Sequence, residues 1–413
     1  MRSVRSWGRL GMKSKWGIRK LGDLCNISSS KRIFAREYCS KGVPFYRGKE
    51  IIEKHKGNAV STELFISEER YAEIKEKNDV PRIGDILLSS VGTLGVPWLV
   101  DEEKFYFKDG NLTWLRVGEE LDNKFLYLWL CSPEAKQQID SKCIGSTQKA
   151  ITIETLSKFD ICIPSIETQR KISNLSFAII SKIVLNKMIN DNLEQQIEAL
   201  LTDFIEEDGT TPVKLGDYLY IKGRIGWKGL KKSEYLPQSN YRIINGETLT
   251  KSGIDWNKAG YISEERYMES PEIMLNVGDI LLSKDGTIGK IGYVDSLDLP
   301  TSVASGIFVI RNNKQGIIST TFIYYLLRSK LFQAFIAART EGSVIPHLYQ
   351  KDFMEFEFPL PAPDRVTKFE KITKPMFSQI VGNLNENKVL ASLRDSLLPK
   401  FMSGELDVSE LDL

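Results

Sequence analysis

The stretch "GDILLSSVGTLG" (Gly84–Gly95) returns as "GDILLSKDGTIG" (Gly278–Gly289), with nine of twelve positions identical at an offset of 194 residues. In both copies a Gly-Asp turn precedes a short apolar run, a pattern that predicts a buried strand. The glycines of "GTLG" and "GTIG" allow a tight turn or a close approach of the backbone to a ligand. We favour a hairpin turn that needs positive φ, and the alternative is a loop beside a phosphate or a base edge.

This repeat is part of a longer one that keeps its order and drifts only between offsets of 194 and 197. "KLGDL" (20–24) returns as "KLGDY" (214–218), and "ISEERY" (66–71) returns unchanged at 262–267. Solenoid repeats have periods of about 20–50 residues, so the chain is a duplicated domain. The residues between the repeated glycines and strand differ, Ser90-Val91 against Lys284-Asp285. A retained scaffold with changed tip residues suits two domains that read different targets.

Each copy is predicted to begin with a mixed α/β part of about 150 residues. Near its end we expect one helix, at 123–141 in the first copy and 320–339 in the second. The aromatic stripes "FLYLWL" and "FIYYLL" in these helices are interpreted as core and not as stacking platforms for nucleic acid.

Each copy is predicted to end in a long helix, at about 167–206 in the first copy. Its seam has near-heptad spacing, which favours a coiled coil. The seam positions are Ile172, Leu175, Ile179, Ile183, Asn186, Asn190, Leu193, Ile197, Leu200 and Phe204, matched 197 residues later by Phe369, Ile372, Met376, Ile380, Asn383, Asn387, Leu390, Arg394, Leu397 and Phe401. Asparagine in a seam can specify register, although these positions could also face water. Pro375 should kink the second helix or delay its start.

Charge is distributed unevenly along the 413 residues, although the formal net charge is only +2. Residues 1–56 hold fifteen Lys/Arg and four Asp/Glu, and residues 214–258 hold nine and four. Two basic segments at matching places suggest two surfaces that face a polyanion, although ordinary solvated lysines would give the same count.

Several protein classes are disfavoured by composition. We find no run of about 18 apolar residues, hence no expected membrane span, and no secretory signal. The five cysteines form no CxxC pair, so we expect reduced thiols in a cytoplasmic protein and no metal site. Phosphate-loop, dinucleotide-binding and amino-methyltransferase motifs are not found. We therefore expect no catalytic residues, and an enzyme with an unrecognised site stays as an alternative.

Four motifs, taken in order and in duplicate, carry a family resemblance. They are the repeated "KLGD", the block "GDILLS…GT.G", the "IP…ETQRKI" start of the first long helix (163–172), and "SLLPKFMSGEL" (396–406). On these motifs the chain resembles the specificity subunit of type I restriction–modification systems. The second long helix departs from the pattern, because "APDRVTKF" lacks the glutamate and glutamine found at Glu167 and Gln169.

The resemblance implies an α+β chain of two tandem target recognition domains, each followed by a long helix, with the helices packed as an antiparallel coiled coil. The expected parts are a disordered leader (1–12), the first domain (13–164), a central helix (165–208), the second domain (209–361), a C-terminal helix (362–403) and an acidic tail (404–413). The helices would hold the domains apart and bind partner subunits.

The function implied is recognition of a bipartite, asymmetric site in double-stranded DNA. Two methyltransferase subunits and the restriction subunits would join the chain, and those partners would hold S-adenosylmethionine, ATP and Mg. A tandem-domain protein-binding scaffold without DNA contact is the alternative. The candidate DNA-binding residues, chosen for their chemistry and predicted loop positions, are Lys31, Arg32, Tyr46, Arg47 and Thr93 in the first copy and Lys222, Arg224, Lys228, Lys284 and Thr287 in the second. Arg47 could instead pair with Glu50.

Overall fold

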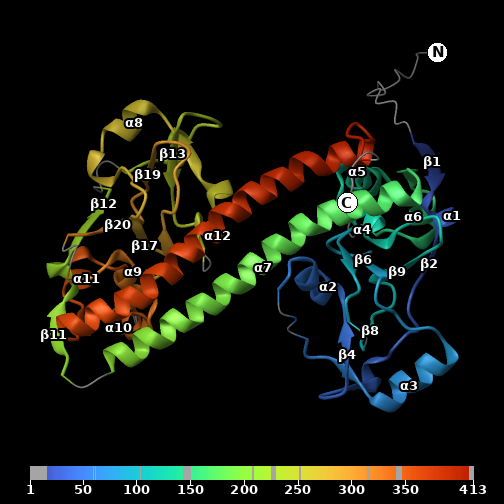
Figure 1. The fold of residues 1–413 in the computed structure, drawn as a ribbon, viewed down its shortest axis with the longest axis horizontal. Coiled ribbons are helices and arrows are strands. Elements are labelled where there is room, and N and C mark those ends of the chain that lie inside the picture. Colours follow the sequence, from blue (N-terminus) through green and yellow to red (C-terminus); the bar gives the residue numbers. More distant parts are fainter. Residues whose placement is uncertain are drawn as a thin grey trace. The chain divides into compact units, whose positions relative to one another are not determined.

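The computed structural model describes residues 16–58, 60, 62–102, 104–142, 150–206, 209–224, 229–250, 253–313, 317–340 and 347–408. The predicted leader and the last five residues of the predicted tail lie outside these ranges. The chain divides into two compact units, one made of residues 1–184 and 388–413 and the other of residues 185–387. Each unit contains one α/β domain together with segments of both long helices (Figure 1).

The domain of the first unit is built on two sheets. An antiparallel sheet has the order β2-β9-β6-β7, and a mixed sheet has the order β3-β5-β4-β8, in which β4 and β8 run parallel. The strands are β1 (Gly17–Lys20), β2 (Cys25–Ser28), β3 (Tyr38–Cys39), β4 (Val43–Tyr46), β5 (Phe65–Ile66), β6 (Ile86–Ser89), β7 (Pro97–Leu99), β8 (Tyr106–Phe107), β9 (Leu112–Val117) and β10 (Asp160–Ile163). The helices are α1 (Leu21–Leu24), η1 (Ala35–Glu37), α2 (Gly48–His55), α3 (Glu68–Lys77), α4 (Asn123–Cys131), α5 (Pro133–Lys142) and α6 (Ile153–Ser157).

The domain of the second unit repeats this plan. Its antiparallel sheet has the order β12-β20-β17-β18, and its mixed sheet has the order β16-β13-β19 with β13 and β19 parallel. The strands are β11 (Thr211–Lys214), β12 (Leu219–Gly223), β13 (Tyr241–Ile244), β14 (Leu249–Thr250), β15 (Gly253–Ile254), β16 (Gly260–Ile262), β17 (Ile280–Ser283), β18 (Ile291–Tyr293), β19 (Thr301–Val303), β20 (Ile307–Asn312) and β21 (Glu357–Leu360). The helices are η2 (Leu215–Asp217), η4 (Lys232–Glu234), η5 (Trp256–Lys258), α8 (Glu264–Met268), η6 (Pro271–Ile273), α9 (Thr320–Arg328), α10 (Lys330–Thr340) and α11 (Gln350–Met354).

The repeated sequence block forms the central strand of each antiparallel sheet. "ILLS" is β6 in the first copy and β17 in the second, and every residue of both strands is buried. Each strand pairs antiparallel on both sides. Its alternate side chains pack into two different apolar clusters, one on each face of the sheet, as a continuous apolar run predicts. The hairpins β6–β7 and β17–β18 confirm the predicted turn at the repeated glycines.

An antiparallel strand pair brings together the two ends of each domain. β1 pairs with β10, so that Gly17 lies opposite Ile163, and β11 pairs with β21, so that Thr211 lies opposite Leu360. Each domain therefore begins and ends at almost the same place, which is the geometry of an exchangeable module.

The prediction of a single helix near the end of each domain is wrong, because two helices are present there in each copy. Ser132 separates α4 from α5, and Ser329 separates α9 from α10. Both serines are extended, and their hydroxyls accept from the backbone N–H of Ala135 and Phe332, which starts a new helix. The aromatic stripes are core as predicted, with Phe125, Trp129, Phe322 and Tyr325 all buried.

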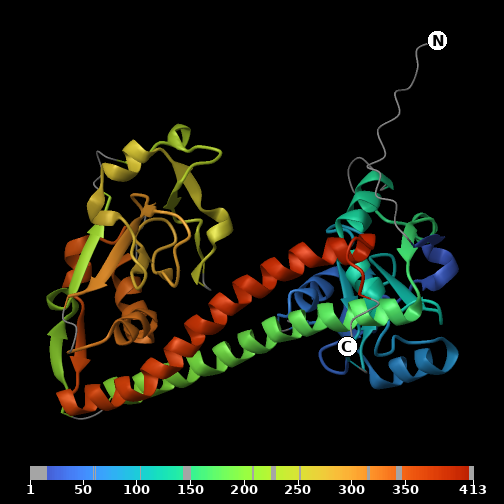
Figure 2. The same ribbon diagram turned by 45° about the horizontal axis from the view of Figure 1, so that its top comes forward.

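The long helices are α7 (Ile166–Ile205) and α12 (Pro363–Ser403). In each unit their segments lie side by side (Figures 1 and 2). In the second unit, residue numbers rise along α7 while those of the contacting residues on α12 fall. Asn190 is hydrogen-bonded to Asn383, and the ring of Phe204 contacts that of Phe369. The helices are therefore antiparallel there. α12 starts at Pro363, so Pro375 does not delay it.

The predicted seam positions are buried or half-buried with one exception. Ile372 is 44% exposed, while the next residue, Thr373, is fully buried. The Thr373 hydroxyl donates to the carbonyl of Phe369 at 3.0 Å, so it can be buried with its polar group satisfied. Phe377 then fills the neighbouring space against Tyr293 and Tyr324. The helix thus turns a slightly different face to the core than the strict offset of 197 predicts.

The seam asparagines form a polar layer in the second unit. The Asn383 amide donates to Asn190 Oδ1 at 2.7 Å, and Asn190 donates to the carbonyl of Ile380 at 3.2 Å. Asn186 donates to Asn387 Oδ1 at 3.0 Å and to Glu386. Asn186, Asn190 and Asn383 are each at most 6% exposed. These side chains thus face the partner helix and not water.

By length and composition alone α7 could cross a membrane, contrary to the expectation from the sequence that no segment qualifies. Its buried face nevertheless carries Asn186 and Asn190, both hydrogen-bonded to α12. This arrangement is typical of a helix that packs against another helix within a protein.

Replacing Asn383 by leucine should lower the free energy of unfolding of the second unit by about 1–3 kcal/mol, because Asn190 Oδ1 would be left buried without a donor. Denaturant unfolding followed by circular dichroism measures the change. The double variant N190L/N383L should recover part of the loss, since both polar partners are then absent. S378A, at an exposed position of the same helix, is the control and should stay within about 0.5 kcal/mol. Parent-like unfolding of N383L would contradict a contribution of this layer to stability.

Candidate nucleic-acid interface

One serine in each copy holds the hairpin loop, residues 90–95 in the first copy and 284–289 in the second. The Ser89 hydroxyl donates to the carbonyl of Thr93 at 2.6 Å and accepts from the N–H of Val96 at 2.9 Å. Ser283 makes the same two bonds, to the carbonyl of Thr287 at 2.7 Å and from the N–H of Lys290 at 2.9 Å. The loop backbone is therefore fixed from inside the strand and does not depend on the side chains at its tip.

The repeated glycines of the loop have two different roles. Gly92 and Gly286 have φ of 81° and 67°, and a Cβ placed on either would meet nothing within 4 Å. Gly95 and Gly289 face a helix instead, where a Cβ would lie 2.4 Å from Ile139 in the first copy and 3.2 Å from Ile336 in the second. The second glycine is thus needed for packing, while the first leaves the loop backbone open to an approaching ligand.

A basic edge lies in the first domain between β2 and η1 and consists of Lys31, Arg32, Phe34 and Arg36. All four side chains are exposed, including the Phe34 ring at 50%. The guanidinium carbons of Arg32 and Arg36 lie 5.5 and 5.4 Å from the centre of that ring. Cations interleaved with an exposed aromatic ring suit contact with phosphate and sugar. Sequence reasoning found Lys31 and Arg32 but missed Phe34 and Arg36.

The basic edge is held by an ion pair that has a counterpart in the second copy. Arg70 Nε lies 2.8 Å from Glu37, and Arg266 Nε lies 3.0 Å from Glu234. Each glutamate also accepts the backbone N–H at the start of its short helix, from Phe34 and Lys231 respectively, both at 2.7 Å. Both arginines belong to the repeated "ISEERY". The repeated Glu-Tyr dipeptides at Glu37 and Glu234 were the available sequence signal for this anchor.

The hairpin loop and the basic edge of the first domain are joined by a short chain of contacts. The Ser90 N–H donates to the carbonyl of Asn111 at 2.8 Å, and the neighbouring Gly110 N–H donates to the Ser29 hydroxyl at 3.4 Å. Arg32 lies 3.9 Å from Asp109 in the same turn. Loop and edge are therefore linked through the turn that precedes β9.

The predicted residues of the second domain differ in their exposure. Lys222 and Thr287 are exposed, and Lys284 is half-buried with its ammonium 5.0 Å from the ring centre of Phe308. Arg224 is buried, and Lys228 lies outside the described residues. In the first domain Thr93 is exposed at the loop tip. The exposed candidates of both copies therefore include the threonine of the repeated "GT".

Direct DNA contact by Tyr46 and Arg224 does not fit their burial, which leaves them 4% and 2% exposed. The Tyr46 hydroxyl donates to Glu102 at 2.8 Å, and burial raises the pKa of Tyr46. Arg224 donates to the carbonyl of Val303 at 3.1 Å, and burial lowers the pKa of its guanidinium. Both side chains are structural, because contacts distant in sequence close over them.

Arg47 makes the pairing that was the alternative for it. It lies 2.8 Å from Glu50, which is fully buried, and its N–H also donates to that carboxylate at 2.8 Å. Hydrogen bonding to Glu50 raises the pKa of Arg47. Arg47 thus neutralises a buried carboxylate at the start of α2, and a structural role accounts for its position.

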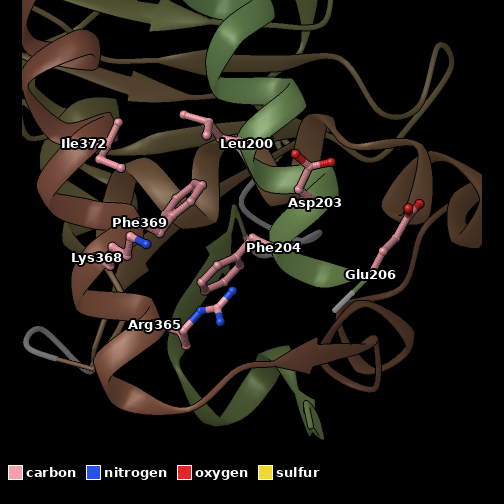
Figure 3. Close-up of a pocket in the computed structure, with 8 residues that line it drawn as sticks. All are labelled: Leu200, Asp203, Phe204, Glu206, Arg365, Lys368, Phe369 and Ile372. Carbon is pink, nitrogen blue, oxygen red and sulfur yellow. The ribbon is translucent and has the colours of Figure 1, made fainter. Parts of the chain in front are cut away.

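A cavity of about 430 Å³ lies between the long helices of the second unit (Figure 3). α7 contributes Asp203 and Glu206, and α12 contributes Arg365 and Lys368, around the rings of Phe204 and Phe369. Its two carboxylates offset its two cations, so this cavity offers no net positive charge to a polyanion and is not assigned to the nucleic-acid interface. Among the described residues, no group of three or more His, Cys, Asp or Glu side chains could hold a metal ion.

Comparison with known proteins agrees with this geometry. A family model described as the type I restriction modification DNA specificity domain matches residues 13–195 and 207–380. The type I restriction enzyme MjaIX specificity subunit of Methanocaldococcus jannaschii is 23% identical over 418 residues, covering 96% of this chain and 94% of that protein. The HindI specificity subunit of Haemophilus influenzae is 23% identical, covering 81% and 91%.

A solved structure shows the same fold. The S subunit of a type I restriction-modification system from M. genitalium aligns over 95% of this chain and 97% of its own, with a TM-score of 0.64 and 18% identity. The two family matches cover most of the chain and fall on the two copies that the repeat defines. The chain therefore belongs to the type I restriction–modification DNA specificity family, as a non-catalytic subunit that supplies DNA sequence specificity to the complex.

Proposed function

We propose that each domain reads one half of a bipartite, asymmetric DNA site. The observation that carries this proposal is the shared hairpin frame with different side chains at its tip. Ser89 and Ser283 hold the two loops with equivalent hydrogen bonds, while position 90 of the first copy and position 284 of the second differ in charge. Two readers with one frame and different contacts would recognise two different sequences.

The basic edge is proposed to contact phosphates. The side chain of Arg32 is 71% exposed, and its ion pair with Asp109 is long, at 3.9 Å. Its guanidinium can therefore bind a phosphate. Arg36 is exposed, and within the described part of the chain no ion pair involves it. Contacts to phosphate fix the position of a protein on DNA, and base contacts by the loop side chains would then select sequence.

The helices are proposed to bind two methyltransferase subunits, which restriction subunits would join. On the α7 segment of the second unit, Leu185, Met188 and Ile189 are 51%, 63% and 37% exposed. An exposed apolar strip on this helix supports docking of a protein partner. S-adenosylmethionine, ATP and Mg would be held by these partners, in a complex located in the cytoplasm.

The double variant R32A/R36A, assembled with its partner subunits, should bind DNA more weakly and with a shallower salt dependence. Each lost phosphate contact should reduce the slope of log affinity against log salt by about 0.9, because fewer counterions are released on binding. Fluorescence anisotropy at several salt concentrations measures the slope. The control K77A/R82A removes the same charge from two other exposed positions of this unit and should keep the parent slope. Equal slopes for all three proteins would contradict the proposed role of the basic edge.

Exchange of residues 211–360 for the matching domain of a relative should change one half of the recognised sequence. These boundaries carry both β11 and β21, so the strand pair that closes the domain stays intact. Mapping of methylated sites in a host that carries the chimera and its partner subunits gives the result. The reciprocal exchange of residues 17–163 should change the other half. A change in both halves after one exchange, or in neither, would refute the assignment of one reader to each domain.

A further inference from the structure

We propose that Lys284, Asp285, His347 and Tyr349, here called the tip cluster, determine base specificity in the second domain. This inference rests on the proposed reading of one half-site by each domain. Sequence reasoning named Lys284 as a candidate DNA-binding residue and Asp285 as a tip residue, whereas His347 and Tyr349 become their neighbours only through the fold.

The backbone around the tip cluster is the same in both copies. The N–H of Ser90 donates to Asn111 at 2.8 Å, and that of Lys284 donates to Gly306 at 2.9 Å. The carbonyl of Ser90 accepts from Ile151, and that of Lys284 accepts from Leu348, both at 3.0 Å. Single β-bridges follow, Val91 with Ala150 and Asp285 with His347. Differences between the two sites therefore lie in the side chains.

In the first copy the side chains at the tip of the loop offer few hydrogen-bonding groups to the edge of a base. Ser90 is 3% exposed, and its hydroxyl is bonded to that of Thr113 at 2.5 Å. Val91 and Ala150 present only apolar atoms. Thr152 caps α6, since its hydroxyl accepts from the N–H of Thr155 at 3.0 Å. The difference at Ser90-Val91 and Lys284-Asp285 is therefore a difference between an apolar site and a polar one.

In the second copy the same position is polar and partly open. Asp285 is bonded to His347 Nδ1, and the two side chains are 42% and 34% exposed. A carboxylate that accepts from Nδ1 orients the imidazole and leaves Nε2 for an external partner. The Tyr349 ring stands at 69° to the imidazole with the centroids 4.5 Å apart, and Tyr349 is 63% exposed. The imidazole and the phenol together offer the hydrogen-bonding groups and the aromatic face that reading a base pair requires. The ammonium of the adjoining Lys284 lies 5.0 Å from the ring centre of Phe308.

Tyr349 does not cap its helix, whereas Thr152, at the matching position of the first copy, does. Tyr349 occupies the N-cap position of α11, where it makes no side-chain capping bond. Tyrosine is not among the favoured N-cap residues, whereas Thr152 at the matching position is one. A residue that is unfavourable for local stability, exposed, and packed on an oriented histidine is better explained by ligand contact than by folding.

The test uses the whole chain with its partner subunits and the variants H347A, D285N and Y349T. Methylation rates are measured on a panel of duplexes with single base changes in either half of the parent site. Discrimination at one or two positions of the second half should fall on the order of tenfold, the effect of losing a specific base contact. Discrimination in the first half should stay at the parent level, which makes that half an internal control. Y349T restores a capping residue, so its melting temperature should equal or exceed that of the parent.

Parent-like discrimination by all three variants would overturn the tip cluster as a reader while leaving the bipartite site intact. An equal loss in both halves, together with a lower melting temperature for every variant, would assign the cluster to folding and also overturn the inference. A parent protein that recognises one contiguous block would instead remove the proposed function, and the inference with it.

Discussion

The hydroxyl of a single strand residue, Ser89 or Ser283, bridges the two sides of the hairpin loop in each domain. Because this bridge comes from a buried strand, the loop keeps its path whatever side chains its tip carries. The repeated "GDILLS…GT.G" is therefore a structural motif that holds the hairpin loop in place. Its aspartates have a similar role. Asp85 accepts from the indole N–H of Trp114 on β9, and Asp279 accepts from Arg311 on β20, each at 2.7–2.8 Å. These bonds join the turn before the repeated strand to the neighbouring strand of the sheet.

The long helices solve a second problem, because apolar seams alone can slide past each other. Amide groups at Asn190 and Asn383 bond in one register only, and any shift would bury them without partners. The first unit contains no such pair among the predicted positions. Its part of the seam joins Ile172 to Phe401 through an apolar cluster. Register can thus be specified in one unit, while apolar packing supplies stability in both.

Local and periodic features could be predicted from the sequence, and features set by distant contacts could not. The duplication, the buried "ILLS" strands and the seams of the long helices follow from repeats and spacing, while their antiparallel packing was implied by the family resemblance. The burial of Tyr46 and Arg224 depends on Glu102 and Val303, which are 56 and 79 residues away in sequence. The predicted burial of Ile372 was wrong because a constant offset between the two helices cannot show that Thr373 and Phe377 are the residues turned toward the core. The anchor from Arg70 to Glu37 was readable in principle, since both members recur, but a single Glu-Tyr dipeptide carries little information alone.

Duplication within one chain has a physical consequence that a homodimer lacks. Two identical subunits would present identical loops and read a symmetric site, since each contact is repeated by symmetry. Here the frame is repeated but the side chains are free to differ, as Ser90 and Lys284 do on equivalent backbone. An apolar tip in one domain and a polar tip in the other can coexist because neither takes part in the hydroxyl bridge that holds its loop. Specificity can therefore change in one half without loss of the scaffold, or of the other half.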